Sequence, residues 1–189
     1  MNQIIIAASL SFFAISQAVA DSGGVADSGK AKYFGVKFGP SNVVDGSNGY
    51  GLFYNYVVFV PNTFNQNELL SKLSIAAEVE YVDLGRSRRN YYFAQVANHK
   101  ASTYGVVGTA SYPINQFVSV LAKVGLASVT RRYQCVVAGC GVDYSTTALG
   151  WHTGVAVQYQ LTPQMTLGVG YDYYPDGYKM MSGIIATNF

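Results

Sequence analysis

Six side chains that can form ion pairs or transfer protons share one face of an alternating sequence pattern. In the segments that hold them, apolar residues occupy one parity and small or polar residues occupy the other. The six lie on the polar parity: Lys37, Glu78, Glu80, Lys123, His152 and Asp172. A charge with little water around it costs several kcal/mol unless it is paired. We therefore expect mutual ion pairs between these side chains, with a small ion pathway and catalytic carboxylates as the alternatives.

Arginines form two clusters outside this pattern, and no motif of a known enzyme accompanies them. The clusters consist of Arg86, Arg88, Arg89, Arg131 and Arg132. Guanidinium groups pair with phosphate through two parallel hydrogen bonds, so both clusters are candidates for polyanion contacts; charge that serves only solubility is the alternative. The motifs of serine hydrolases, zinc proteases and phosphate-binding loops are absent from the sequence. We therefore predict no catalytic residue, no metal ligand and no cofactor.

The composition excludes two classes of protein. Half of the 189 residues (50%) are hydrophobic and only 12% are charged, which is about half the ~25% of an ordinary soluble domain. A disordered chain has low hydrophobicity and high charge, so this class is excluded. A formal net charge of +2 is also too small for a strongly basic nucleic-acid-binding protein. The low fraction of charged residues and the 16 tyrosines are therefore not typical of a protein whose whole surface contacts water.

The first twenty residues have the features of a cleaved signal peptide. An apolar run ends in Ala-Val-Ala at 18–20, the small-x-small pattern of a signal-peptidase site, although no Lys or Arg precedes it. A retained membrane anchor is the alternative. Residues 21–30 are rich in Gly and Ser and predict a flexible lead-in. A single domain is then expected over 31–189.

Alternation predicts strands through most of this domain. At 33–39 the even positions are apolar and the odd positions are small or polar, which is the period of a strand with two different faces. The expected strands cover 33–39, 49–60, 74–81, 104–112, 118–126, 149–159, 166–173 and 181–189. After the signal peptide, no run approaches the ~18 apolar residues of a transmembrane helix.

The apolar face of these strands is expected to contact lipid. The polar face consists mostly of Gly, Ala, Ser and Thr, which fit the narrow interior of an eight-stranded barrel. The apolar face carries almost no charge, and tyrosines recur near strand ends, as in the aromatic girdles of membrane barrels. We therefore predict an all-β fold, an eight-stranded antiparallel up-and-down transmembrane β-barrel. Its lumen would hold the six polar side chains; a soluble lipocalin-like binder is the alternative.

The connections between strands are expected to alternate in length, as in bacterial outer-membrane barrels. Short turns with Pro are predicted at 112–116 and 161–164. Longer loops on the outer side are predicted at 40–48, 85–100, 131–145 and 174–180. The long connection at 61–72 does not fit this alternation. Both arginine clusters fall in the predicted outer loops, so we expect them to contact lipopolysaccharide or host polyanions.

The only two cysteines, Cys135 and Cys140, lie in the predicted loop 131–145. In an exported protein, two nearby cysteines are expected to form a disulfide. The closed loop is short, so the entropic model assigns it only about 2 kcal/mol. The disulfide is expected to shape the tip of the loop and not to hold the barrel.

Several short segments resemble the transmembrane domain of OmpA-like, porin-family outer-membrane barrels. They are 33–39, 78–85, 110–114, 122–125 and 157–163. The segment 185–189 resembles the last strand of that family, and the resemblance implies that the outer-membrane assembly machinery recognises Phe189. Family members often carry a lumen Lys and Arg where this chain has Thr109 and Gly168. The resemblance therefore does not extend to the lumen salt bridge of the family.

The resemblance implies a place in the bacterial outer membrane and a structural or surface-interaction role, such as envelope integrity or adhesion through basic loops. The expected partners are outer-membrane lipid and lipopolysaccharide, the assembly machinery and host surface molecules, and not nucleic acid. A narrow porin for small solutes or ions is the first alternative. A lipid-modifying enzyme is the remote alternative, for which His99 and His152 are the only histidines.

Overall fold

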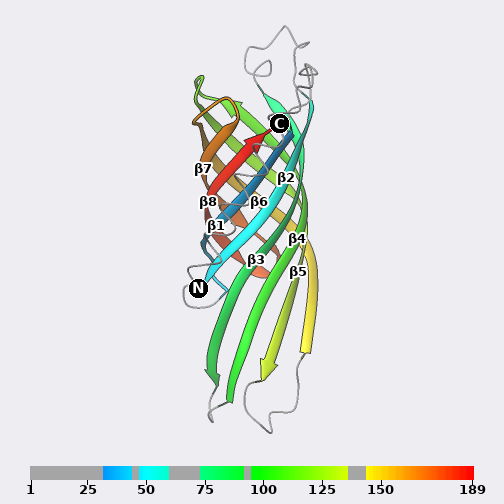
Figure 1. The fold of residues 1–189 in the computed structure, drawn as a ribbon. Coiled ribbons are helices and arrows are strands. Elements are labelled where there is room, and N and C mark those ends of the chain that lie inside the picture. The colour runs from blue at the N-terminus through cyan, green and yellow to red at the C-terminus, as the bar shows by residue number, and fades with distance from the viewer. Residues whose placement is uncertain (1–31, 44–46, 60–72, 92–94, 136–143) are drawn as a thin grey trace.

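Eight antiparallel strands close into one barrel, in chain order (Figure 1). The computed structural model describes residues 32–43, 47–59, 73–91, 95–135 and 144–189. The strands are β1 Lys32–Pro40, β2 Asn48–Phe59, β3 Ser74–Tyr91, β4 Gln95–Pro113, β5 Val118–Cys135, β6 Tyr144–Gln160, β7 Met165–Tyr173 and β8 Lys179–Asn188. Each strand pairs with its neighbours in sequence, and β1 pairs with β8. The predicted up-and-down barrel is confirmed.

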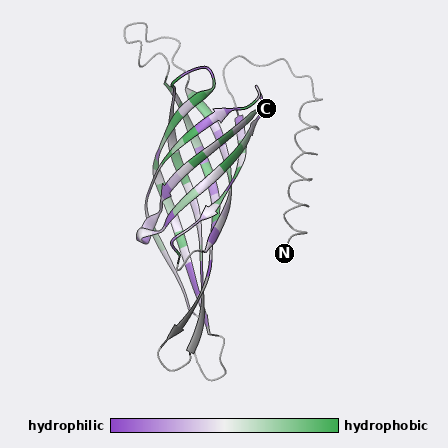
Figure 2. Cartoon of the chain, turned by 90° about the vertical axis from the view of Figure 1, so that its left-hand side faces the viewer, coloured by the Kyte–Doolittle hydropathy of each residue, from purple (hydrophilic) through white to green (hydrophobic). Residues whose placement is uncertain are grey.

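Side chains alternate between the outer surface of the barrel and its lumen. On β6, Trp151 and Val155 are exposed on the outer surface, whereas the residue that follows each of them, His152 and Ala156, is buried in the lumen. Hydrophobic and hydrophilic residues accordingly alternate along the strands of the wall (Figure 2). No helix of the described residues is long and apolar enough to cross a membrane. An apolar outer surface on a closed barrel is the arrangement that lipid stabilises.

The short turns lie at one end of the barrel, next to the start of β1 and the end of β8. In the β4–β5 turn, the Asn115 side chain accepts hydrogen bonds from the N–H groups of Phe117 and Val118, both at 2.8 Å. In the β6–β7 turn, Thr162 Oγ1 accepts the N–H of Met165 at 3.0 Å. Both turns were predicted. Short turns mark the periplasmic end of an outer-membrane barrel, so the opposite end is extracellular.

Four neighbouring strands extend beyond the rest at the extracellular end. β3 to β6 contain 18, 19, 18 and 17 residues, whereas the other four strands contain 9 to 12. In Figure 1 these four strands continue below the closed barrel as a curved sheet. The prediction of loops at 85–100 and 131–145 was therefore wrong for all of their described residues. Outside the membrane both faces of a strand meet water, so no apolar alternation marks it in the sequence.

Candidate functional site

Four of the six predicted polar side chains meet in one buried ion cluster. The ammonium group of Lys37 donates to Glu80, to Asp172 Oδ2 at 3.1 Å and to Tyr174 Oη at 2.8 Å. The His152 ring lies between both carboxylates, with Nδ1 3.2 Å from Glu80 Oε1 and Nε2 3.1 Å from Asp172 Oδ1. The ring also stacks on Tyr174, with centroids 4.5 Å apart. The cluster thus links strands on opposite walls of the lumen.

The other two predicted side chains form a second ion pair on the periplasmic side of the cluster. Lys123 Nζ lies 2.6 Å from Glu78 Oε1. Asn55 donates to Glu78 Oε2 at 3.3 Å and to Thr109 Oγ1 at 3.2 Å. Thr109 stands directly opposite Lys123 in the β4–β5 register. A lumen cation therefore lies on β5, directly beside Thr109.

Glycines on the lumen face make room for these ion pairs. A Cβ atom on Gly154 would lie 2.5 Å from Asp172 Oδ1, and one on Gly105 would lie 3.2 Å from the Glu80 side chain. Real Cβ atoms essentially never approach another heavy atom to 2.5 Å. The small residues of the polar parity are thus a packing requirement of the ion pairs, since an eight-stranded barrel has little free interior.

Apolar side chains fill the lumen on both sides of the ion pairs. The extracellular layer comprises Val43, Val82, Leu84, Ala101, Ala127, Val129, Tyr174, Tyr178 and Met180. The periplasmic layer comprises Phe53, Leu121, Ala156, Ile184 and Ala186. A cavity of about 190 Å³ opens between the periplasmic turns, and Lys123 and Glu78 are among its lining residues.

Tyr174, which was not among the predicted lumen residues, is fully buried and binds Lys37. Position 174 was assigned to an outer loop, whereas the chain there enters a short 3-10 turn, Pro175–Gly177, that packs inward. The alternation of β7 could have predicted this position, because residue 174 has the same parity as the lumen residue Asp172. Asn55 was missed for a different reason: no charge drew attention to its strand.

The two histidines lie in different surroundings. His152 belongs to the buried ion cluster described above. His99 lies at the extracellular mouth, where its ring stacks on Tyr133 with centroids 4.5 Å apart, and its Nε2 is 3.3 Å from Tyr178 Oη. The structure therefore does not bring the two candidate histidines of the enzyme hypothesis together.

The arginines of β5 point to opposite faces of the extended sheet. Arg131 faces inward, forms an ion pair with Asp176 and lies over the ring of Tyr178, 5.5 Å from its centroid. Partial burial lowers the pKa of Arg131, but the hydrogen bond to Asp176 and the neighbouring tyrosines outweigh this effect and raise the pKa above its ordinary value. Arg132 faces outward and is exposed. The cluster is therefore split between an internal ion pair and a free surface.

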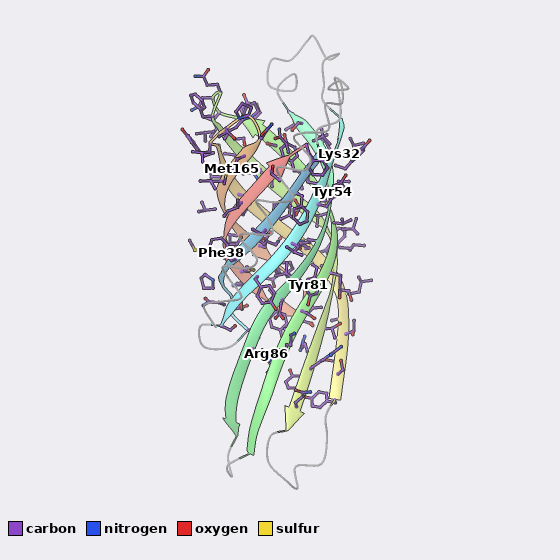
Figure 3. The ribbon with its side chains drawn as sticks, in the orientation of Figure 1. Lys32, Phe38, Tyr54, Tyr81, Arg86 and Met165 are labelled. Atoms are coloured by element: carbon purple, nitrogen blue, oxygen red, sulfur yellow. The ribbon has the colours of Figure 1, made fainter. Side chains whose placement is uncertain are left out.

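The arginines of β3 lie on the extended part of that strand. Arg86 is exposed, and Figure 3 places it beyond Tyr81 toward the extracellular end. The backbone positions of Arg88 and Arg89 are opposite Asn98 and Ala97 in the β3–β4 register. All five predicted arginine positions thus lie on strands and not on loops.

Four other predictions are not tested by the described residues. Residues 1–30, the connection 61–72 and Cys140 lie outside the described residues, so the signal peptide, the lead-in and the disulfide stay predictions. Phe189 follows β8 at the periplasmic end, where its N–H donates to the carbonyl of Lys32 at 3.1 Å. Its ring lies 6.4 Å from that of Tyr54, and Figure 3 shows Lys32 and Tyr54 at this end. Recognition of Phe189 by the assembly machinery also stays a prediction.

A closed barrel with an apolar outer surface, tyrosines near the strand ends and an ion-paired lumen defines a β-barrel protein of the bacterial outer membrane. The chain belongs to the outer membrane protein beta-barrel domain family, whose model matches residues 5–188. The resemblance to OmpA-like barrels is thereby confirmed. No curated protein matches the sequence.

Several solved structures share this fold. Ail, the attachment invasion locus protein of Yersinia pestis, crystallised with the heparin analogue sucrose octasulfate, is 14% identical; the match covers 85% of this chain and 99% of Ail, with a TM-score of 0.55. Neisserial surface protein A is 14% identical, with coverage of 85% and 97% and a TM-score of 0.52. The N-terminal barrel of Pseudomonas aeruginosa OprF is 11% identical, with coverage of 84% and 97% and a TM-score of 0.52.

Proposed function

We propose that this protein is a structural barrel with a closed lumen whose extended extracellular sheet binds anionic molecules at the cell surface, as an adhesin does. The observation that carries the proposal is the position of the arginines. All five arginines of the chain lie on β3 and β5, in the part of the sheet that extends toward the extracellular end. The extended segments 84–91, 95–103, 127–135 and 144–150 contain no Asp or Glu.

The packing of the lumen supports the structural part of the proposal. Two ion pair groups and two apolar layers fill the interior of the described barrel. An ion that crossed this lumen would have to separate buried pairs and pass the fully buried side chains of Leu84 and Met180. Planar-bilayer recording of the purified protein should therefore show no stable single-channel conductance. Stable unitary currents would contradict the closed lumen and favour the narrow porin.

The chemistry of arginine supports the binding part of the proposal. Guanidinium groups form bidentate hydrogen bonds with sulfate and phosphate oxygens. Ail, which shares the fold, was crystallised with a polysulfated heparin analogue, and such a ligand has the chemistry that this sheet can bind. The role is not enzymatic: lipid A with acyl chains altered by the wild type but not by His99→Ala or His152→Ala would contradict it.

The test is binding of soluble heparin to the protein in zwitterionic phospholipid bilayers that contain no lipopolysaccharide. Arg88→Ser and Arg89→Ser should each weaken binding by about 2- to 5-fold, as expected for the loss of one charge contact. Raising the salt concentration should weaken wild-type binding further, because salt screens exposed charges. Lys32→Ser, which removes one charge at the periplasmic end of β1, is the matched control and should change nothing. Equal affinities for all four proteins would refute the adhesin role.

A further inference from the structure

Three cations stand in one row across the outer face of the extended sheet. The β3–β4 register places Arg86 opposite Lys100, and the β4–β5 register places Lys100 opposite Arg132. Side chains of directly opposed residues point to the same face, with Cβ atoms about 4.5–5.5 Å apart. Arg86 and Arg132 are exposed, and the Lys100 side chain is one-third exposed (33%). We call Arg86, Lys100 and Arg132 the basic row.

A β-bulge in β3 brings Arg86 into this row. The register shifts between Asp83 and Gly85, so one residue of β3 has no partner on β4. Gly85 has φ of 101° and donates its N–H to Asp83 Oδ1 at 2.9 Å; glycine adopts this conformation without strain. Before the bulge, the even-numbered residues Glu80 and Val82 face the lumen. If β3 continued as a regular strand with no bulge, Arg86 would keep that even parity and point inward.

The basic row lies at the level of the lipid headgroups. On the outer face of β4, Lys100 lies twelve residue steps from Tyr112, which is near the periplasmic turn. At about 3.4 Å per residue and a tilt of about 40°, they span about 30 Å along the barrel axis. The apolar band of an outer-membrane barrel is about 25 Å tall. Tyr81 and Tyr104, whose rings are 4.8 Å apart, lie just inside the row, where interfacial aromatic residues are expected.

The three cations of the basic row have only one carboxylate partner among the described residues. Like charges directly opposite each other destabilise a sheet, and here three cations are neighbours. Asp83 Oδ2 lies 2.8 Å from Lys100 Nζ, but among the described residues no carboxylate pairs with Arg86 or Arg132. Anions from outside the chain would relieve this repulsion.

Beside the row, the outer face is hollowed between polar and aromatic side chains. A groove of about 160 Å³ is lined by Tyr81, Lys100, Ser102, Tyr104, Thr130 and Arg132. The groove offers two cations and several hydroxyl donors. A group the size of a phosphate fits such a space.

We propose that the basic row and this groove bind the phosphate groups of a phosphorylated outer-leaflet lipid of the lipid A class. The position at headgroup height decides between a lipid and a soluble polyanion, because the acyl chains of a lipid can lie on the apolar wall below the row. Arg86 and Arg132 are also among the arginines proposed for adhesion, whereas Lys100 and the groove are not; the lipid site rests on the register and the groove alone.

The experiment titrates folded protein in neutral detergent with bisphosphorylated lipid A and, in parallel, with lipid A from which both phosphates have been removed. Native mass spectrometry counts the lipids bound. The variant Arg86→Ser/Lys100→Ser/Arg132→Ser removes the row. The control Lys30→Ser/Lys32→Ser/Lys179→Ser removes the same net charge at positions outside β3 to β6. Heat-modifiable gel mobility shows that each protein is folded.

Wild type should prefer phosphorylated lipid A, and the row variant should bind it roughly 100-fold more weakly, since each Lys or Arg at a membrane surface contributes about 1 kcal/mol. The control should stay within about 3-fold of wild type. Equal binding of both lipids by wild type overturns the proposal and needs no variant. The proposal is also overturned if inorganic phosphate displaces lipid A as well as free lipid A does at the same concentration. It is likewise overturned if the row variant no longer binds heparin but binds lipid A as wild type does. If the triple variant does not fold, Arg132→Ser alone should still weaken lipid binding about 5-fold, and an unchanged affinity overturns the proposal.

Discussion

Replacing Lys37 by methionine removes the ammonium group that binds Glu80, Asp172 and Tyr174 in the buried ion cluster. Methionine has nearly the same length, so the packing of the side-chain stem is retained. The carboxylates of Glu80 and Asp172 then face each other. Among the described residues, His152 is the only remaining group that contacts both of them and can carry a positive charge. The variant therefore isolates the contribution of one buried charge.

The magnitude follows from burial and distance. The side chains of Lys37, Glu80 and Asp172 are 0–3% exposed, so solvent screens them little. At an effective dielectric constant of about 20, opposite charges 3.1 Å apart attract by roughly 5 kcal/mol, and the desolvation of the pair offsets part of this. Removing one partner of a buried pair costs about 3–5 kcal/mol, because the other charge stays buried without compensation. We expect Lys37→Met to lower the free energy of unfolding by that amount.

The assay is reversible urea unfolding in phospholipid vesicles, followed by tryptophan fluorescence. Trp151 is the only tryptophan and is 68% exposed on the outer surface of β6, so it contacts lipid in the folded barrel and water after unfolding. Lys32→Met, the same chemical change at an exposed position of β1, is the control. Heat-modifiable gel mobility gives an independent measure of the folded fraction.

A double variant separates charge from packing. In Lys37→Met/Glu80→Gln, one of the two carboxylates is neutral, so the double variant should be more stable than Lys37→Met alone by about 1–2 kcal/mol. If Lys37→Met costs less than about 1 kcal/mol, or no more than Lys32→Met, the buried ion cluster does not contribute as argued. A double variant less stable than the single variant would also refute the charge argument.

Three further predictions concern the wall, the lumen packing and assembly. Val106→Arg places a charge on the outer face midway between Tyr112 and Lys100 and should cost about 2–4 kcal/mol in the same urea assay, whereas Val106→Leu should be close to neutral. Gly154→Ala should destabilise by about 1–3 kcal/mol, because its Cβ would meet the Asp172 carboxylate; Gly108→Ala, whose Cβ has no neighbour closer than 3.7 Å, should stay within about 0.5 kcal/mol. Phe189→Ser should reduce the folded barrel in outer-membrane fractions several-fold but leave refolding from urea unchanged, and equal membrane yields would contradict the assembly role.

Much of the barrel could be predicted from the sequence because a strand displays its two faces as odd and even positions. Parity alone separated the lumen residues Lys37, Glu80 and Asp172 from the lipid-facing residues, since each environment accepts a different kind of side chain. The extended part of β3 carried no such signal. Residues 86–90 are polar at every position, so the strand there was assigned to a loop.

Parity places a residue on a face but says nothing about which residues of other strands it meets. That Lys37 binds Glu80 and Asp172, while Lys123 binds Glu78, depends on the tilt and stagger with which the eight strands close.

The sequence by itself thus determined the class of fold, the lipid-facing surface and the set of polar residues in the lumen, because local alternation reports the solvent of each face. Only the tertiary structure decided the pairing of the lumen charges and the placement of Tyr174 among them. It also decided the basic row: the bulge at Gly85 reverses the parity of β3, and the register of three strands then aligns Arg86, Lys100 and Arg132. Such long-range register is a property of the closed barrel, and no single strand encodes it.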